Sequence, residues 1–239
     1  MAQNRNAREK EEGSDSVKPA HCTFADNSER QIFVRCTVHN RNWGFAILRL
    51  SYTRFDPVMN KWDWVGELPE PRHHHSVAFL RGKVYLVGGA DPRDDEERTK
   101  SAVLSTTWCF DPATRSWSME PALGVARKSF SLVAHRLALY AIGGQDKKGR
   151  VLRSVERFDP KTRSWREVRA MTVARMGPAA AKCREHIWVA GGMTGERHRP
   201  VSATVECYNS KTNQYIHSVI VTLNDNHINA RIQHELHIH

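Results

Sequence analysis

Three double glycines divide the middle of this chain into units of similar length. They are Gly88-Gly89, Gly143-Gly144 and Gly191-Gly192, so the first glycines lie 55 and 48 residues apart. An aromatic residue precedes each pair by three positions, at Tyr85, Tyr140 and Trp188. A period of about 20 to 50 residues is the mark of repeat architectures, in which each unit is one supersecondary element. The repeat therefore restricts the fold more than any overall composition does.

Further positions keep the same register around each glycine pair. An arginine lies sixteen residues before each first glycine, at Arg72, Arg127 and Arg175. An aromatic residue follows each pair, at Phe110, Phe158 and Tyr208, and seven residues later comes Trp117, Trp165 or Tyr215. The same seven-residue offset joins Phe55 to Trp62, where no double glycine precedes. One position is not uniform, because Trp108 occurs where the next two units have Glu156 and Glu206.

Within each unit the local pattern predicts four short antiparallel strands. In the first unit these are "HSVAFL", "KVYLVGG", "STTWCFDP" and "SWSM". Arg81-Gly82 suits a hairpin turn between the first two strands, and Pro112 ends the third because it cannot donate to a ladder. A four-stranded antiparallel sheet in about fifty residues is typical of a β-propeller blade. Glycines without a Cβ let backbones approach closely, and the aromatic rings supply apolar area between stacked blades.

These residues resemble the kelch family, over about residues 52–218. "SVERFDPKTRSWREVRAM" and "TVECYNSKTNQY" are most similar to the kelch-like subfamily. That resemblance implies a BTB domain and a helical BACK region, followed by a six-bladed propeller. It also implies that the propeller captures a substrate protein while the BTB part binds a cullin, as a ubiquitin-ligase substrate adaptor. No BTB-like or BACK-like segment is recognisable before the repeats in this sequence.

We therefore predict an all-β fold, a partial kelch-type β-propeller of three four-stranded blades plus a half blade. The expected organisation is a disordered charged segment at 1–30, an irregular segment and incomplete blade at 31–70, three kelch repeats at 71–218, and a non-kelch tail at 219–239. Phe55 to Trp64 would form the outer two strands of the incomplete blade. The predicted number of blades is too small for a closed ring. This indicates a fragment, a splice form, a truncated gene model or a piece completed by a partner. Open outer strands would favour oligomers.

Composition restricts the class of protein further. No run of eighteen apolar residues predicts a membrane span, and the charged N-terminus has no signal-peptide core. Five scattered cysteines without a CxxC motif indicate reduced thiols, hence a cytoplasmic location with the nucleus as the alternative. The formal charge of +10 favours acidic partners. Nucleic acid is not the expected partner, because the arginines are spread along the chain and no nucleic-acid-binding motif occurs.

The candidate binding residues are Arg72, Arg127 and Arg175. In kelch-like adaptors the arginine at the start of the innermost strand commonly faces the substrate-binding mouth, so the resemblance places these three there. Guanidinium groups suit carboxylate or phosphate recognition by forked hydrogen bonds. The alternative is that they pair with neighbouring blade loops. The charged insertion at 91–100 is expected to be a solvated surface loop.

No other residues of the sequence form a persuasive site. His73, His74 and His75 are expected to alternate between faces of a strand and so not to converge on a metal, and His234, His237 and His239 would chelate only adventitiously. Cys109 and Cys207 share a register that favours packing over redox sensing. No catalytic motif, metal site or cofactor site is recognisable. The leading interpretation is a non-enzymatic substrate-recognition module for a cullin-based ubiquitin ligase, with a cullin bound only if a BTB segment is supplied. The alternatives are an actin-associated scaffold and, less favoured, a small-ligand enzyme.

Overall fold

The computed structural model describes the backbone of residues 20–22, 34–36, 51–56, 59–91, 102–198, 200–224 and 227–233. Side chains are described for 59–61, 64, 66–91, 102–198 and 200–216. Every regular element in these ranges is a strand, so the predicted all-β class is confirmed. Within the same ranges no helix is long and apolar enough to cross a membrane.

Three antiparallel sheets correspond to the three predicted blades. The first consists of β5 (Ser76–Leu80), β6 (Lys83–Val87), β9 (Thr107–Asp111) and β10 (Ser116–Glu120). The second consists of β11 (Ser131–His135), β12 (Ala138–Ile142), β13 (Val155–Asp159) and β14 (Ser164–Val168). The third consists of β15 (Ala179–Cys183), β16 (His186–Ala190), β17 (Thr204–Asn209) and β18 (Gln214–Asn224), to which β19 (His227–Gln233) adds a fifth strand. The strands follow each other in chain order from the innermost to the outermost.

The two ends of the chain add strands that the repeat pattern did not include. The tail at 219–239 was expected not to continue the repeat, and in the structure it extends β18 and returns as β19. The predicted half blade is the pair β3 (Ser51–Asp56) and β4 (Lys61–Glu67). A second pair, β1 (Ala20–Cys22) and β2 (Val34–Cys36), precedes it, and β2 lies against β3. Strand β1 falls inside the segment expected to be disordered, whose other residues, 1–19 and 23–30, lie outside the described ranges.

The charged insertion also lies mostly outside the described residues. Its first residue ends β7 (Ala90–Asp91), which pairs with β8 (Ala102–Val103). The short β7–β8 ladder brings the two ends of the insertion together. The expectation of a solvated loop for residues 92–100 remains a prediction.

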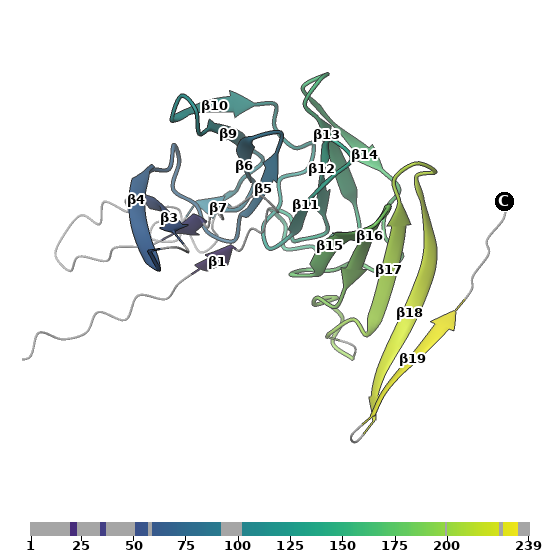
Figure 1. The fold of residues 1–239 in the computed structure, drawn as a ribbon. Coiled ribbons are helices and arrows are strands. Elements are labelled where there is room, and N and C mark those ends of the chain that lie inside the picture. Colours follow the sequence, from purple (N-terminus) through teal and green to yellow (C-terminus); the bar gives the residue numbers. More distant parts are fainter. Residues whose placement is uncertain are drawn as a thin grey trace, which may run out of the picture.

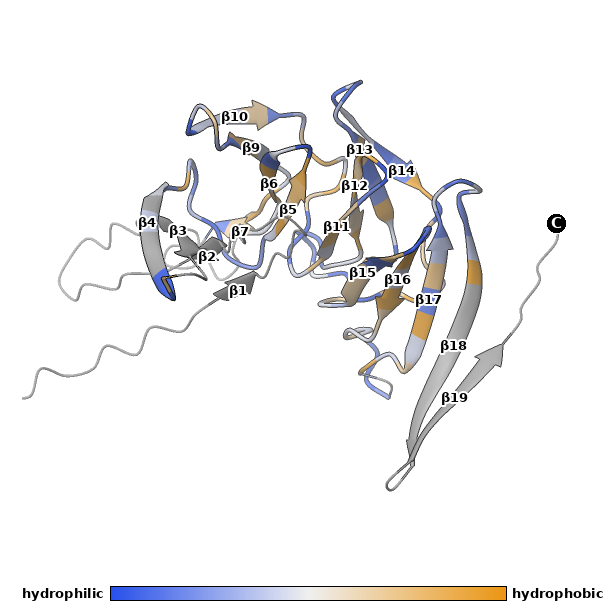
Figure 2. Cartoon of the chain, in the orientation of Figure 1, coloured by the Kyte–Doolittle hydropathy of each residue, from blue (hydrophilic) through white to orange (hydrophobic). Residues whose placement is uncertain are grey.

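The blades fan out from their innermost strands, so the propeller is open (Figure 1). Strand β11 lies between β5 and β15 and contacts both. Apolar residues concentrate in the inner strands, whereas the turns that join the outer strands are hydrophilic (Figure 2). The described sheets do not close into a ring, which confirms the predicted partial propeller.

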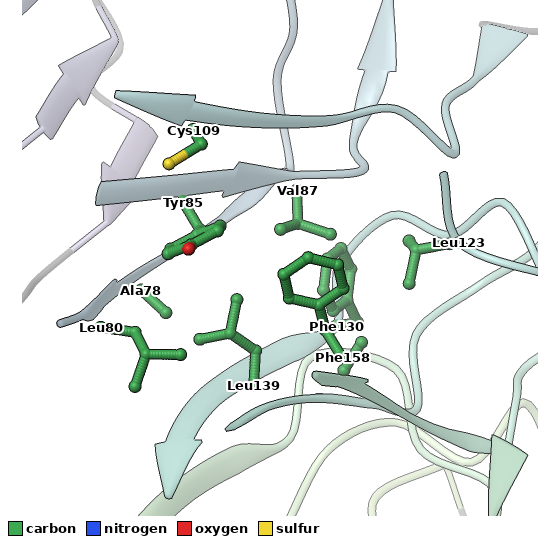
Figure 3. Packing of buried hydrophobic residues seen from close by; sticks show 10 residues of the cluster. Ala78, Leu80, Tyr85, Val87, Cys109, Leu123, Phe130, Leu139 and Phe158 are labelled. Carbon is green, nitrogen blue, oxygen red and sulfur yellow. The ribbon is translucent and has the colours of Figure 1, made fainter. Parts of the chain in front are cut away.

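Two of the three hydrophobic clusters of described residues lie between successive blades, and the third lies in the first blade. Tyr85 of β6 contacts Phe158 of β13 with ring centroids 5.8 Å apart, beside Val87 and Leu139 (Figure 3). Tyr140 of β12 makes the same kind of contact with Tyr208 of β17, at 6.0 Å. The first and second blades therefore use the aromatic residue before the double glycine to contact the next blade. Burial of such rings supplies most of the driving force for stacking the sheets.

The repeated tryptophans have different surroundings in the structure. Trp165 donates from Nε1 to the carbonyl of Pro121, 3.0 Å away, and so ties the second blade to the end of the first. Trp117 packs against Phe110 of its own blade, with ring centroids 5.1 Å apart. The side chain of Trp62 lies outside the described residues. Trp165 is thus an inter-blade contact of the kind that the pattern predicted.

The double glycines lie where the next blade approaches most closely. A Cβ on Gly88 would come within 2.6 Å of the Arg127 carbonyl oxygen, and one on Gly143 within 2.5 Å of the Arg175 carbonyl oxygen. Both glycines have positive φ, at 58° and 66°. Glycine is therefore required at both positions by backbone conformation and by space.

Candidate functional site

The three register arginines lie in the loops that enter the innermost strands, at the end of the blades that we call the loop end. Each is four residues before β5, β11 or β15. The side chains of Arg72, Arg127 and Arg175 are all 0% exposed. Arginine is almost never fully buried unless its charge is paired, so the surroundings of each guanidinium decide its role.

Each buried guanidinium joins the ends of two strands of its own blade. Arg175 donates from Nη1 to the carbonyl oxygens of Gly191 and Thr204, at 2.8 and 2.9 Å. Arg127 donates in the same way to Gly143 and Ser154, at 2.8 and 3.1 Å. These carbonyls end the second strand and begin the third, so the arginine replaces ladder hydrogen bonds where the strands diverge.

A buried carboxylate completes the site in the second and third blades. Arg127 pairs with Glu156 at 2.6 Å and Arg175 with Glu206 at 2.9 Å. Glu156 also accepts from the backbone N–H groups of Gly124 and Val125, at 2.6 and 3.1 Å. Every member of this network is therefore bonded, which is the condition under which a buried ion pair is tolerated. Burial lowers the pKa of Arg127, and Glu156 opposes that effect.

In the first blade, different residues pair with the buried arginine. Trp108 occupies the position of the buried glutamate, and Glu70 from the entering loop pairs with Arg72 instead. Thr106 accepts a further bond from Arg72 Nη2 at 2.9 Å. Pro69 stands where the second blade has Gly124, and proline has no N–H that would need a carboxylate acceptor. The non-uniform position in the repeat is thus compensated within the same blade.

The expected contact of these arginines with a ligand is corrected by their burial. No part of the three side chains reaches solvent, so they cannot line a mouth in this structure. The guanidinium groups of Arg127 and Arg175 pair with carboxylates of their own blades, and Arg72 pairs with Glu70 of its entering loop. The Arg127 carbonyl is the group that reaches the neighbouring blade, where it accepts from Gly89 N at 2.9 Å.

Other side chains remain accessible at the loop end. Arg150 pairs with Asp146 at 2.7 Å across one turn, and Lys148 is exposed beside them. Met193 and Val201 form an isolated bridge in the third blade and are 49% and 63% exposed. The loop end therefore presents mixed charged and apolar groups on loops that the buried arginines anchor.

The adjacent histidines do not behave as residues of a strand. His74 has a φ of 51°, and β5 begins only at Ser76. The rings of His73 and His74 consequently meet edge to face, with centroids 4.7 Å apart, instead of alternating between faces. Burial, together with the nearby charge of Arg72, lowers the pKa of His75 to about 3. Among the described residues no group of three or more His, Cys, Asp and Glu is placed to hold a metal ion, and the tail histidines lie outside them.

Two of the cysteines occupy packing positions. Cys109 and Cys207 are free thiols in the interior, and desolvation raises the pKa of Cys207 to about 11. Neither thiol has the thiolate character that redox sensing requires at neutral pH. Cys183 at the end of β15 is a free thiol and exposed.

The repeat pattern contained a second arginine register that the sequence interpretation missed. Arg81, Arg136 and Arg184 each lie nine residues after a buried arginine and are exposed in the turn between the first two strands of a blade. The signal was the equal spacing, and it was overlooked because the turns were examined only as hairpin connections. These residues lie at the opposite end of the blades from the loop end.

Comparisons with known proteins agree with this geometry. A family model described as the KLHDC2/KLHL20/DRC7 Kelch-repeats domain matches residues 40–192, and a Kelch motif model matches 174–216. Alpha-scruin of Limulus polyphemus is 34% identical over 160 residues, which cover 66% of this chain and 17% of that protein. Human Kelch-like protein 13 is 29% identical over 97 residues, which cover 41% of this chain and 14% of that protein. The chain thus spans less than a fifth of the length of these two relatives.

A solved structure shares the fold. The structure titled "Structure of YjhT" is 15% identical, with a TM-score of 0.64, and the match covers 82% of this chain and 64% of that one. At this level of identity the likeness bears on the fold alone. It extends over more of the chain than the three blades occupy, in accord with the extra strands before the first blade.

Proposed function

Because the chain belongs to the kelch-repeat family, we propose that it is a non-enzymatic protein-interaction module that recognises a substrate for a cullin-based ubiquitin ligase. The cullin would be bound through a BTB segment supplied by another part of the protein or by another chain. A protein substrate, favoured to be acidic by the net charge of +10, would be bound in the cytoplasm or nucleus.

The observation that carries this proposal is the way the loop end is built. Buried arginine–carboxylate pairs fix the loops that enter each innermost strand, while side chains such as Met193 and Val201 project from neighbouring loops into solvent. Rigid scaffolds with exposed, chemically mixed loops are the usual basis of protein recognition. The similarity to Kelch-like protein 13 supports the adaptor role.

Co-purification tests the adaptor role directly. The tagged chain would be expressed with and without a separately tagged BTB–BACK segment, and bound cullin would be measured by immunoblotting. Cullin should be recovered only when the BTB–BACK segment is present and joined to the chain. Recovery of cullin by the chain alone would contradict the proposed arrangement. Absence of cullin from both preparations, with and without the BTB–BACK segment, would contradict it as well.

An actin-associated scaffold is the alternative function. The similarity to alpha-scruin covers more of the chain than the similarity to Kelch-like protein 13, which favours keeping this candidate. Co-sedimentation of the purified chain with filamentous actin distinguishes the two. Sedimentation with actin, together with absence of cullin in the first experiment, would replace the adaptor proposal.

A further inference from the structure

The end of the blades opposite the loop end is formed by two sets of short turns. One set joins the first and second strands of each blade, at residues 80–83, 135–138 and 183–186. The other joins the third and fourth strands, at residues 111–116, 159–164 and 209–214. We call these six segments together the turn face. It contains none of the loops on which the proposed function rests.

Basic residues outnumber acidic residues on the turn face. It contains eight Lys and Arg residues against three Asp and Glu residues. Lys83 is paired with Asp111 at 3.1 Å, and Glu185 is shared between Arg136 and Lys211. Arg163 pairs with Glu120 of β10 at 3.0 Å. Within the described part of the chain no ion pair involves the other basic side chains of the turn face, which are Arg81, Arg115, Lys161 and Arg184. Such a concentration of one sign raises the local potential and attracts groups of the opposite sign.

The arginines of the turn face adopt a backbone conformation that does not favour them. Arg81, Arg136 and Arg184 have φ values of 54°, 47° and 52°. In the other set of turns, Arg115 and Arg163 have φ values of 54° and 49°, at a position where the remaining turns have Asn60 and Asn213. Asparagine and glycine adopt this conformation more readily than arginine does. The chain thus retains arginine at five positions where another residue would be less strained.

An exposed leucine lies in the central turn of this basic surface. Leu137 follows Arg136, has a φ of 62° and is 56% exposed. The corresponding positions in the neighbouring blades are Gly82 and Glu185. Arg136 bonds to Glu185, so the central turn lies against that of the third blade. An apolar side chain thus projects from the same surface as the unpaired guanidinium groups.

The buried His135 lies close to basic residues of this part of the molecule. His135 ends β11 just before the central turn. Burial lowers the pKa of His135, and the charges of Arg136 and Lys182 lower it further.

We propose that the turn face is a second docking surface, for an acidic protein segment that carries an apolar side chain next to its carboxylates. The unpaired guanidinium groups of Arg81 and Arg184 bind the carboxylates, by forked hydrogen bonds that suit this geometry. Leu137 contacts the apolar side chain between them. This inference goes beyond the proposed function, because it concerns the opposite end of the blades.

Nucleic acid fits the turn face less well than an acidic protein segment does. Asp111, Asp159 and Glu185 are interspersed among the basic groups and would repel a continuous phosphate backbone. In the six turn segments there is no Phe, Tyr or Trp on which a base could stack. An exposed leucine adds apolar contact for a protein side chain but offers nothing to a phosphate.

A fluorescence anisotropy titration of the whole chain tests the proposal. The probe is a fluorescein-labelled oligoglutamate peptide with one central leucine, and a second peptide has alanine in place of the leucine. The double variant Arg81→Ser, Arg184→Ser should bind the leucine peptide about tenfold more weakly. Its matched control is Arg166→Ser, Arg169→Ser, which removes the same charge from exposed positions on and just after β14, outside the turn face, and should change binding less than about twofold. Equal weakening by both double variants would show general charge attraction only and overturn the proposal.

The variant Leu137→Asn separates binding from folding. Asparagine suits the positive φ at this position, so thermal stability should be unchanged or higher. Binding of the leucine peptide should nevertheless weaken several-fold, down to the level of the alanine peptide. Unchanged binding would remove Leu137 from the proposal, and tighter binding of a single-stranded oligonucleotide than of the peptide would overturn it in favour of nucleic acid. The cullin experiment is independent of these outcomes, because it does not involve the turn face.

Discussion

The junction between the second and third blades and the outer face of the third blade use the same repeat positions. Among the described residues, another blade covers only the junction. A Cβ on Gly143 would lie 2.5 Å from the Arg175 carbonyl, whereas a Cβ on Gly191 would meet nothing within 4 Å. The two glycines have nearly equal φ values, 66° and 63°. Gly191 therefore occupies a repeat position at which space requires glycine only when another blade follows.

Backbone hydrogen bonds show the same contrast. Gly144 N donates to the Arg175 carbonyl at 2.7 Å, and Gly177 N donates to the Ser129 carbonyl at 2.7 Å. The equivalent donor at the outer face, Gly192 N, has no following arginine carbonyl. Each junction is thus specified by two backbone bonds at the loop end, and the third blade presents half of such a junction.

The side chains on the two surfaces differ accordingly. Tyr140 at the occupied junction is 2% exposed, whereas Trp188 in the same register is partly exposed. In β15 every residue except Ala180 is exposed, whereas the corresponding β11 contains buried Val133 and His135. The contribution of a repeat residue to stability is therefore expected to depend on whether another blade packs against it. Substituting the same repeat position at the junction and at the outer face tests this.

The largest difference is expected for truncation of the aromatic residue before the double glycine. Tyr140→Ala should lower the free energy of unfolding by about 4 kcal/mol, since it removes a buried ring from between two blades. Trp188→Ala should cost about 1 kcal/mol, although tryptophan is the larger residue, because no blade covers it. Urea unfolding followed by circular dichroism measures both values. Equal costs would show that the outer face is covered in solution.

The glycine pair provides the next largest effect. Gly143→Ala should lower the free energy of unfolding by about 3 kcal/mol, from a clash with the Arg175 carbonyl added to the strain of positive φ. Gly191→Ala should cost only the strain, about 1 kcal/mol. The same urea titrations apply, and the φ contribution cancels in the difference between the variants. A difference near zero would contradict the steric explanation.

A pH titration compares the entering loops of the first two blades. His75 occupies the position of Phe130 and is buried, with its pKa lowered from 6.5 to about 3. The unfolded chain therefore binds a proton between these pH values that the folded chain excludes, and stability falls as pH decreases through this range. From pH 7 to pH 5 the loss should be about 2 kcal/mol. In the variant His75→Phe most of this dependence should vanish, and its persistence would assign the effect to another group.

The sequence was sufficient to predict the repeats and the strands within them, because glycine pairs, aromatics and prolines encode local structure directly. It was not sufficient for the arginines. Spacing placed Arg72, Arg127 and Arg175 in one register, but whether a guanidinium reaches solvent depends on distant partners such as Glu206. Sequence spacing also could not show that β2 lies against β3, since the four strands before the first blade carry no double glycine. The three arginines thus share the sequence register of residues at a binding mouth, but their side chains are not exposed.

The smallest perturbation is chemical labelling of the cysteines, which leaves the fold unchanged. Cys183 at the outer face is exposed, whereas Cys207 on β17 of the same blade is buried, with its pKa raised to about 11. Reaction with iodoacetamide at pH 8, followed by peptide mass spectrometry, should modify Cys183 and leave Cys207 and Cys109 unmodified until the chain is unfolded. Slow labelling of Cys183 that becomes fast in Trp188→Asp would indicate a covering partner or second copy, because the charge would expel it. Slow labelling in both proteins would contradict the exposure of this face, so the thiol reports on the open junction independently of any stability measurement.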